Sequence, residues 1–273
     1  MTEHVPTDRP PAARPPAPAA RPPAPAAASR GGRGGPADPG DAFWAALDDP
    51  ERAALRAVAR PRKYAPRTPL CYQGDDSDHI IIIESGWAKV TSSSEDGREV
   101  VLAVRGPGDL VCESAVLGRR ERSATVAALS PLRALVVPAA RFTGFLDAHP
   151  GVWRLVSGTF VRRLDDADRR LQAHVSAHGA RRLAILLTEL AEASARHAPP
   201  DAAGRIVIGP PLSQEELGSW MDASRETVAR ALGTLRAEGL VVTGRRKITV
   251  VDAARLAEFA RTPERPSADA FTM

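Results

Sequence analysis

Cysteine is scarce in this sequence: Cys71 and Cys112 are its two thiols among 273 residues. Two thiolates are too few for the four-cysteine set of an iron–sulfur cluster, and a tetrahedral zinc site would need histidines as well. The histidines that would be candidates for such a role are scattered along the chain: His79, His149, His174, His178 and His197. We therefore expect two buried, free thiols and no metal site.

Long hydrophobic runs are also missing. The longest candidate, Leu183 to Leu190, is far shorter than the roughly 20 residues needed to cross a bilayer, and it contains Thr188 and Glu189. The chain opens with polar residues such as Glu3 and His4, where a secretory signal would have a basic stretch followed by an apolar core. These absences predict a cytoplasmic protein with no membrane partner.

Motifs of catalysis are absent too. The sequence has no nucleophile elbow, no phosphate-cradling glycine loop and no metal-ligand spacing. Asp165, Asp166 and Asp168 resemble paired catalytic carboxylates, but a helix points them in three directions, beside Arg169 and Arg170. A solvated helix face is the better interpretation, and we do not predict an enzyme.

The net charge is small, and half of it comes from the N-terminal segment. The formal net charge is +4, and residues 1–40 contribute half of it through five arginines against three acidic residues. That segment consists almost wholly of Pro, Ala, Gly and Arg, so we expect a disordered tail. Weak contact between its arginines and nucleic acid is the alternative. Global charge alone does not indicate a nucleic-acid partner.

Residues 41–150 are predicted to form a mainly β domain. Residues 41–60 have helical spacing with Pro50 at a break between two short pieces. After Pro61, short β-rich runs alternate with Gly and Pro at a spacing typical of a small antiparallel sandwich or barrel. The runs are HIIII, WAKVTS, EVVLAV, SATVAAL and RALVV.

Residues 151–178 are predicted to form one long helix. Its apolar and small residues recur at alternating steps of four and three, as in a coiled coil, which suggests a homodimer. The alternative is a single helix packed on its own β domain. The predicted seam is Trp153, Ser157, Phe160, Leu164, Ala167, Leu171, His174 and His178. We expect a hinge near His178 to Ala180.

Residues 179–256 follow the order of a winged helix, with a C-terminal tail at 257–273. The order is helix, helix, turn, helix and hairpin. Ser213 and Glu216 have capping-box spacing, Ser224 is placed to cap the next helix, and Gly239 is placed to end it.

The helix that follows Ser224 has two distinct faces. At about 100° per residue, one face is aliphatic: Val228, Ala231, Leu232 and Leu235. The other carries Arg225, Glu226, Ala229 and Arg230. Arginine forks onto guanine and glutamate accepts from the cytosine amino group, so this mixed face suits a major groove. An intrahelical Glu226–Arg230 pair is the alternative.

The stretch LSQEELGSWMDASRETVARALGTLRAEGLV closely resembles the helix-turn-helix of the Crp/Fnr family of bacterial transcription regulators, and the similarity extends from about Phe43 to Val251. The resemblance implies an α+β fold: an antiparallel, jelly-roll-like β-roll, a dimerisation helix and a winged helix-turn-helix. It implies a dimer on double-stranded DNA with a palindromic TGTGA-like operator, and makes RNA polymerase a candidate partner. The expected DNA-binding residues are Ser224, Arg225, Glu226, Thr227, Arg230, Arg245, Arg246 and Lys247.

Residues 108–126, GDLVCESAVLGRRERSATV, resemble the phosphate-binding cassette of the cyclic-nucleotide-binding domain. In that family, residues matching Arg122, Ser123 and Glu113 serve the phosphate and the ribose 2′-hydroxyl; the alternative is a plain Glu113–Arg122 pair. Cys112 stands where the cassette usually has glycine. The expected ligand-binding residues are Glu113, Ser114, Arg122, Ser123, Arg163, Ala167 and Asp168.

Ala167 and Asp168 stand where cyclic-AMP sensors of the family have Thr-Ser. The effector could therefore be cyclic AMP bound weakly, cyclic GMP, another nucleotide or none, with no tightly bound cofactor. We predict a sequence-specific transcription regulator that responds to an effector through its β domain. The alternative function is a cyclic-nucleotide-binding module that acts on a protein partner.

Overall fold

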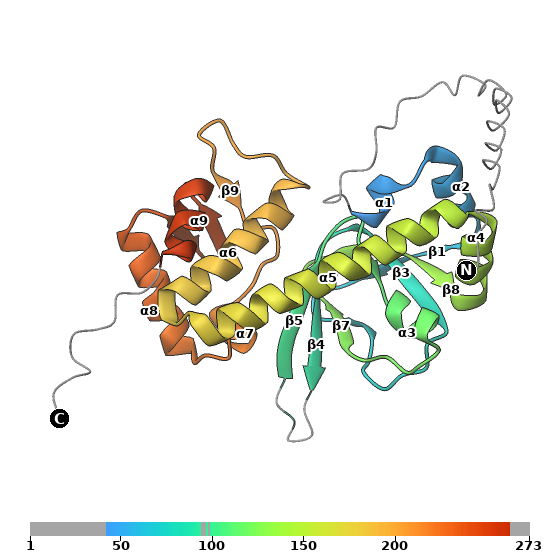
Figure 1. The fold of residues 1–273 in the computed structure, drawn as a ribbon, viewed down its shortest axis with the longest axis horizontal. Helices are drawn as coiled ribbons and strands as arrows, with labels where there is room; N and C mark the ends of the chain where they lie inside the picture. The colour runs from blue at the N-terminus through green and yellow to red at the C-terminus, as the bar shows by residue number, and fades with distance from the viewer. Residues whose placement is uncertain (1–41, 94–96, 98, 263–273) are drawn as a thin grey trace, which may run out of the picture. The chain divides into compact units, whose positions relative to one another are not determined.

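The computed structural model describes residues 42–93, 97 and 99–262 (Figure 1). The tail predicted at residues 1–40 lies outside this range, as do the last residues of the predicted C-terminal tail. None of the helices in the described ranges has the length and apolar character that a membrane crossing requires.

Two short helices precede the β domain, α1 (Phe43–Ala46) and α2 (Asp49–Val58). The predicted pair of short helical pieces is confirmed, but the break falls at Leu47 and Asp48, just before Pro50. Pro50 lies in the first turn of α2, where a missing N–H costs no hydrogen bond. The helix α2 begins at its cap residue, Asp48. The Asp48 carboxylate accepts a hydrogen bond from the Glu51 N–H, and the Glu51 carboxylate accepts one from the Asp48 N–H.

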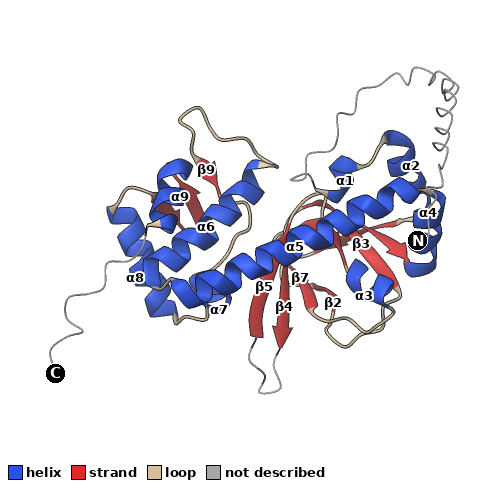
Figure 2. Cartoon of the chain, viewed as in Figure 1, coloured by secondary structure: helices blue, strands red, loops and turns tan. Residues whose placement is uncertain are grey.

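The β domain consists of two four-stranded antiparallel sheets, with strand orders β1-β8-β3-β6 and β2-β7-β4-β5. Figure 2 shows the strands in red and the helices in blue. This confirms the predicted antiparallel architecture, and all five β-rich runs form strands. The strands are β1 (Arg60–Tyr64), β2 (Pro69–Cys71), β3 (His79–Ser85), β4 (Ala88–Ser93), β5 (Glu99–Arg105), β6 (Leu110–Val111), β7 (Thr125–Ala128) and β8 (Leu132–Pro138).

The isoleucine run of β3 explains how this domain holds together. Successive strand residues face opposite sides. Ile80 and Ile82 therefore pack against the helices, including Phe142 of α4 (Ala139–Ala148), while Ile81 and Ile83 pack between the sheets. All four isoleucines are fully buried. Burying both faces of one central strand requires an unbroken apolar run.

Helix α5 (Pro150–Ser176) has one buried face and one exposed apolar stripe. Val152, Val156, Thr159 and Ala173 are buried, whereas the exposed large apolar residues are Trp153, Val161, Leu164, Leu171 and Val175. Trp153, Leu164 and Leu171 of the predicted seam lie on this exposed stripe. Phe160 packs against the helix's own domain, and Val161 and Val175 join Leu164 and Leu171 at steps of three, seven and four.

The chain bends between α5 and α6 (Gly179–Ala195) at Ala177 and His178, and Gly179 adopts φ +47°. Arg182 secures this bend. Its Nε donates to Ala177 O at 2.8 Å, its Nη2 to His174 O at 2.5 Å and its Nη1 to Met221 O at 2.9 Å. One guanidinium thus joins the end of α5 to the end of α7 (Gln214–Met221).

The C-terminal domain is a winged helix. After α6 come β9 (Ile206–Val207), α7 (Gln214–Met221), α8 (Arg225–Ala237), β10 (Val241–Gly244), β11 (Lys247–Val250) and α9 (Ala253–Arg261). The strands form a sheet of order β10-β11-β9. Helix α9 runs through the boundary predicted at residue 256, because Leu256 and Ala260 are both buried in this domain's core.

The turn between α7 and α8 depends on Gly218. A Cβ added there would lie 2.6 Å from the Ala223 carbonyl oxygen, whereas a Cβ on Gly233 of α8 would meet nothing closer than 3.9 Å. We expect Gly218→Ala to lower the free energy of unfolding by about 1–3 kcal/mol through overpacking. Gly233→Ala should raise it by up to about 1 kcal/mol through helix propensity. Urea unfolding of both variants checks this, and equal gains would contradict it.

Candidate nucleic-acid interface and ligand pocket

Both helices of the helix-turn-helix begin where the sequence places their caps. The Ser213 hydroxyl accepts from the Glu216 N–H at 3.1 Å, and Glu216 Oε2 accepts from the Ser213 N–H at 2.8 Å. Ser224 Oγ accepts from the Thr227 N–H at 3.2 Å. These bonds fix the start of α7 and of α8, and they confirm the predicted capping box and cap.

The end of α8 is equally well defined. Gly239 adopts φ +67°, and the Leu240 N–H returns to Leu235 O at 2.9 Å while the Gly239 N–H bonds Arg236 O at 3.0 Å. This is the Schellman arrangement, which favours glycine because of the positive φ. The helix is therefore held at both ends.

The two predicted faces of α8 are confirmed. Val228, Ala231, Leu232 and Leu235 are buried, whereas the opposite face is exposed: Arg225, Glu226, Ala229 and Arg230. No ion pair joins Glu226 to Arg230 within the described chain, and Arg230 Nη2 instead donates to Thr227 Oγ1 at 3.3 Å. The three charged groups remain directed to solvent.

The carboxyl of Glu226 is held in its ionised form. Its pKa is lowered by hydrogen bonds from its own N–H and from the Ser224 hydroxyl, with smaller contributions from the charges of Arg225 and Arg230. An ionised glutamate acts as a hydrogen-bond acceptor and cannot donate. This face of α8 therefore presents one acceptor between two planar donors.

The wing between β10 and β11 contains three predicted DNA-binding residues, and they differ in their surroundings. Arg245, Arg246 and Lys247 are all exposed. Arg246, with φ +50°, donates Nε to Pro211 O at 2.9 Å and Nη2 to Glu216 Oε2 at 3.2 Å. Arg246 therefore ties the wing to the start of α7, while Arg245 and Lys247 extend into solvent.

A cavity of about 600 Å³ lies between the β domain and α5, with Trp220 of α7 also at its wall. This volume is typical of small-molecule sites. Six of the seven predicted ligand-binding residues line it: Glu113, Ser114, Arg122, Ser123, Arg163 and Ala167. Asp168 is exposed and does not line it. The structure thus brings together residues from α3 (Glu113–Gly118), the loop that follows it and α5.

The lining of this cavity is strongly positive. Arg105, Arg122, Arg163 and Arg170 face a single carboxylate, Glu113. Burial lowers the pKa of Arg105 to about 10, with Arg163 adding to the effect, so its guanidinium stays charged at neutral pH. Arg105 and Arg170 were not predicted from the sequence, because no local motif indicates that β5 and the middle of α5 meet here.

Arg122 and Glu113 do not pair with each other as the alternative interpretation supposed. Glu113, which is 1% exposed, pairs through Oε1 with Arg163. Arg122, which is 3% exposed, donates to Cys112 O at 3.0 Å and His79 O at 2.6 Å. Glu113 Oε2 and Arg122 Nε are buried without a hydrogen-bond partner, a state that costs free energy until a partner arrives.

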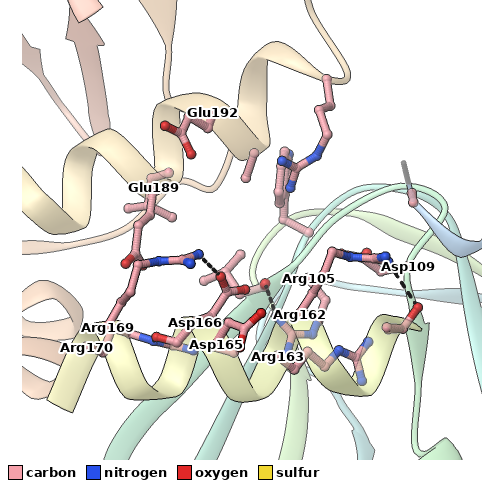
Figure 3. Close-up of a pocket in the computed structure, with 18 of the residues that line it drawn as sticks. Arg105, Asp109, Arg162, Arg163, Asp165, Asp166, Arg169, Arg170, Glu189 and Glu192 are labelled. Atoms are coloured by element: carbon pink, nitrogen blue, oxygen red, sulfur yellow. Dashed lines mark hydrogen bonds and ion pairs between the residues drawn. The ribbon is translucent and has the colours of Figure 1, made fainter. Parts of the chain in front are cut away.

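A second cavity, of about 430 Å³, lies between α5 and α6, next to the end of β5 (Figure 3). Arg162, Asp165, Asp166 and Arg169 of α5 line it, opposite Glu189 and Glu192 of α6. Burial raises the pKa of Glu189 to about 7. Six arginines and five carboxylates line the space, so its charges nearly cancel and it lacks the positive excess of the first cavity.

Metal-binding geometry is not found in the described ranges, where no group of three or more His, Cys, Asp or Glu side chains could hold an ion. The two cysteines are free thiols. Cys71 is buried as predicted, but Cys112 is only half-buried because it lies at the edge of the larger cavity.

Comparisons with known proteins match both domains. A model described as a cyclic nucleotide-binding domain matches residues 61–149, and one described as a Crp-like helix-turn-helix domain matches residues 181–259. The chain is 30% identical to the cyclic AMP receptor protein of Thermus thermophilus over 201 residues, which covers 73% of this chain and 87% of that protein.

Two further matches are consistent with the first. A CRP-like cAMP-activated global transcriptional regulator of Mycobacterium tuberculosis is 25% identical over 209 residues, covering 77% of this chain and 92% of its own. The structure of FixK2 from Bradyrhizobium japonicum superposes with a TM-score of 0.64 at 20% identity, covering 75% of this chain and 98% of that one. The second match supports the fold alone.

Proposed function

The chain belongs to the Crp/Fnr family of transcription regulators, and from that premise we propose that it binds a palindromic, TGTGA-like operator as a homodimer and responds to a cyclic nucleotide. It would act in the cytoplasm, with RNA polymerase as a candidate partner. The observation that carries this proposal is the exposed trio Arg225, Glu226 and Arg230 on a helix whose opposite face is buried.

The trio suits base edges better than phosphates. A carboxylate would be repelled by phosphate, but in the major groove it accepts from the cytosine amino group, and each arginine can fork onto guanine O6 and N7. Arg245 and Lys247 on the wing are placed to contact phosphates, which position a protein without reading sequence. Ser224 and Thr227 hydrogen-bond each other in the N-terminal cap of α8. We propose that they contact DNA in addition to this capping role.

The homodimer is proposed from the exposed stripe on α5. Val161, Leu164, Leu171 and Val175 are large apolar residues on the surface of one helix. An apolar seam at steps of three and four matches the requirement of a coiled coil. Two copies joined along this stripe would present two α8 helices to the two halves of a palindrome.

The effector is proposed to occupy the larger cavity. Four arginines against one glutamate suit a phosphate, and the unpartnered Glu113 Oε2 is an acceptor suited to a ribose hydroxyl. Arg122 would offer its Nε to the phosphate while keeping its bonds to the two carbonyls. A cyclic nucleotide would act by stabilising one of two orientations of the winged helices.

Selection of bound sequences from a random DNA pool tests the proposal. Full-length protein would be used with no nucleotide, with cyclic AMP and with cyclic GMP. We expect a palindrome with TGTGA-like halves and stronger enrichment with one of the two nucleotides. Selected DNA with no preferred sequence would overturn the proposal that α8 recognises specific bases. An operator enriched equally in all three conditions would overturn gating by these two nucleotides while leaving DNA binding in place.

Ser123→Ala tests the ligand site. Ser123 is exposed at the rim of the cavity, so its loss should leave the fold intact. Losing one hydrogen bond to a charged phosphate costs about 1.5–3 kcal/mol, roughly a tenfold to hundredfold rise in Kd. Titration calorimetry with the nucleotide that enhances selection measures this. Ser85→Ala, also exposed but outside the cavity, should bind as the unaltered protein does, and equal affinity in both variants would contradict the assignment.

A further inference from the structure

The two cysteines of the chain lie side by side although 41 residues separate them. Cys71 ends β2, and Cys112 lies between β6 and α3; their Sγ atoms are 3.3 Å apart and share a hydrogen bond. Cys71 faces Val126 in the strand register, next to the cassette that contains Arg122 and Ser123. The fold thus places Cys112 at the wall of the larger cavity, with the buried Cys71 thiol directly against it.

We propose that Cys71 and Cys112 form a reversible disulfide in response to peroxide, and that this bond alters the ligand cavity. The effect on ligand binding rests on the effector role proposed above, but the oxidation itself does not. Cys112 lines the cavity and is half-buried, so a small oxidant can reach the pair from that side.

The electrostatics of the pair favour one thiolate beside one thiol. The hydrogen bond from Cys112 lowers the pKa of Cys71 to about 7; burial and Asp75 oppose this, and the Arg122 charge and a bond from the Val126 backbone support it. The same hydrogen bond, together with burial, raises the pKa of Cys112. A low-pKa thiol next to a second thiol is the arrangement of redox-sensing cysteine pairs.

The chemistry balances with hydrogen peroxide as the oxidant. The Cys71 thiolate attacks one peroxide oxygen, the O–O bond breaks, and hydroxide leaves, giving a sulfenic acid. The Cys112 sulfur then attacks the Cys71 sulfur, and its proton and the sulfenic OH leave together as water. The two sulfurs lose two electrons, and the peroxide gains them. A small-molecule thiol reverses the reaction by thiol–disulfide exchange.

The disulfide would change the shape of the cavity because Cys112 lines it. A disulfide requires about 2.05 Å between the sulfurs, so the pair must close from 3.3 Å. Cys112 has φ +73°, precedes Glu113 directly, and its carbonyl accepts from Arg122. Movement of this residue therefore displaces the two side chains proposed to hold the ribose and the phosphate.

Intact-mass measurement of the full-length protein after peroxide treatment tests the oxidation. With only two cysteines in the chain, we expect the mass of one chain less two hydrogen atoms, no free thiol, and full recovery with dithiothreitol. The oxidation rate should rise through about pH 7, following the Cys71 thiolate. Two free thiols after treatment, cross-links between chains, or sulfinic acid in place of the disulfide would each overturn the inference.

Cys112→Gly is the matched variant. Glycine tolerates the positive φ without strain, so this variant should fold at least as well as the unaltered protein, and Cys71→Ser removes the other thiol. Neither should form the bond. We expect oxidation to raise the Kd for cyclic AMP or cyclic GMP about tenfold, the size of one lost charge-assisted hydrogen bond, and to leave the Kd of Cys112→Gly unchanged.

The outcomes separate this inference from the proposed function. If the protein forms the disulfide but its reduced form binds neither nucleotide, the proposed cyclic-nucleotide effector is refuted and the proposed oxidation is supported. Protein that binds nucleotide equally well in both redox states, with the disulfide present, overturns the link between bond and cavity.

Discussion

Arg225→Ala/Arg230→Ala should bind the selected operator about a hundredfold more weakly than the unaltered protein. Each guanidinium that forks onto a guanine contributes about 1–3 kcal/mol of discrimination, and about 1.4 kcal/mol corresponds to a factor of ten. Both side chains are exposed, so the midpoint of thermal unfolding should not change. Fluorescence anisotropy with a labelled operator, at one fixed salt concentration, measures the loss.

Arg236→Ala is the control for this loss. The side chain of Arg236 is exposed in the last turn of the same helix and donates to Thr243 Oγ1 at 3.5 Å. Its removal takes away one of the two charges lost in the double variant, without touching the trio. Glu226→Gln should change the preferred base at one position of each half-site, since an amide donates as well as accepts. Unchanged affinity in the double arginine variant, together with an unchanged base preference in Glu226→Gln, would exclude recognition of bases by α8.

The second large effect is expected from Leu164→Glu/Leu171→Glu on α5. These residues are 63% and 65% exposed in one chain, so acidic replacements should not disturb its own fold. Four carboxylates facing one another in the proposed seam would separate the dimer. A monomer holds one half-site, and losing the linked second contact lowers affinity by about 10²–10⁴-fold.

Two measurements check this prediction together. Sedimentation equilibrium should show a dimer for the unaltered protein and a monomer for the variant, and operator affinity should fall in parallel. Leu164→Met/Leu171→Met keeps apolar volume at the same positions, a swap that costs little, and should stay dimeric with high affinity. A glutamate variant that remains a dimer would place the subunit contact elsewhere.

Features fixed by neighbours in sequence were predictable. The caps at Ser213 and Ser224, the C-terminal glycine of α8 and the two faces of that helix depend on residues within a few turns of one another. The isoleucine run of β3 is equally local. Helical and strand periodicity, with capping chemistry, were enough to find them.

Features that depend on distant contacts were not predictable from one sequence. Glu113 pairs with Arg163, 50 residues away, and not with Arg122. The strand β1, with the sequence RPRKY, has four exposed residues and Pro61, so it lacks an alternating pattern, and only its pairing with β8 identifies it. The packing of Phe160 against its own domain likewise has no signal in helical spacing alone.

Arg182 and its neighbour Arg181 both tie the end of α5 to the C-terminal domain, Arg181 through Ser176 O and Ala260 O. A lysine at position 182 would keep the charge, but its compact ammonium lacks the planar fork that reaches two carbonyls at the end of α5 and one at the end of α7. The last turn of α5 would then lose its guanidinium link to the end of α7, while the Arg181 bonds remain. Under the proposed function, we expect such a chain to bind nucleotide and operator with weaker coupling between the two events.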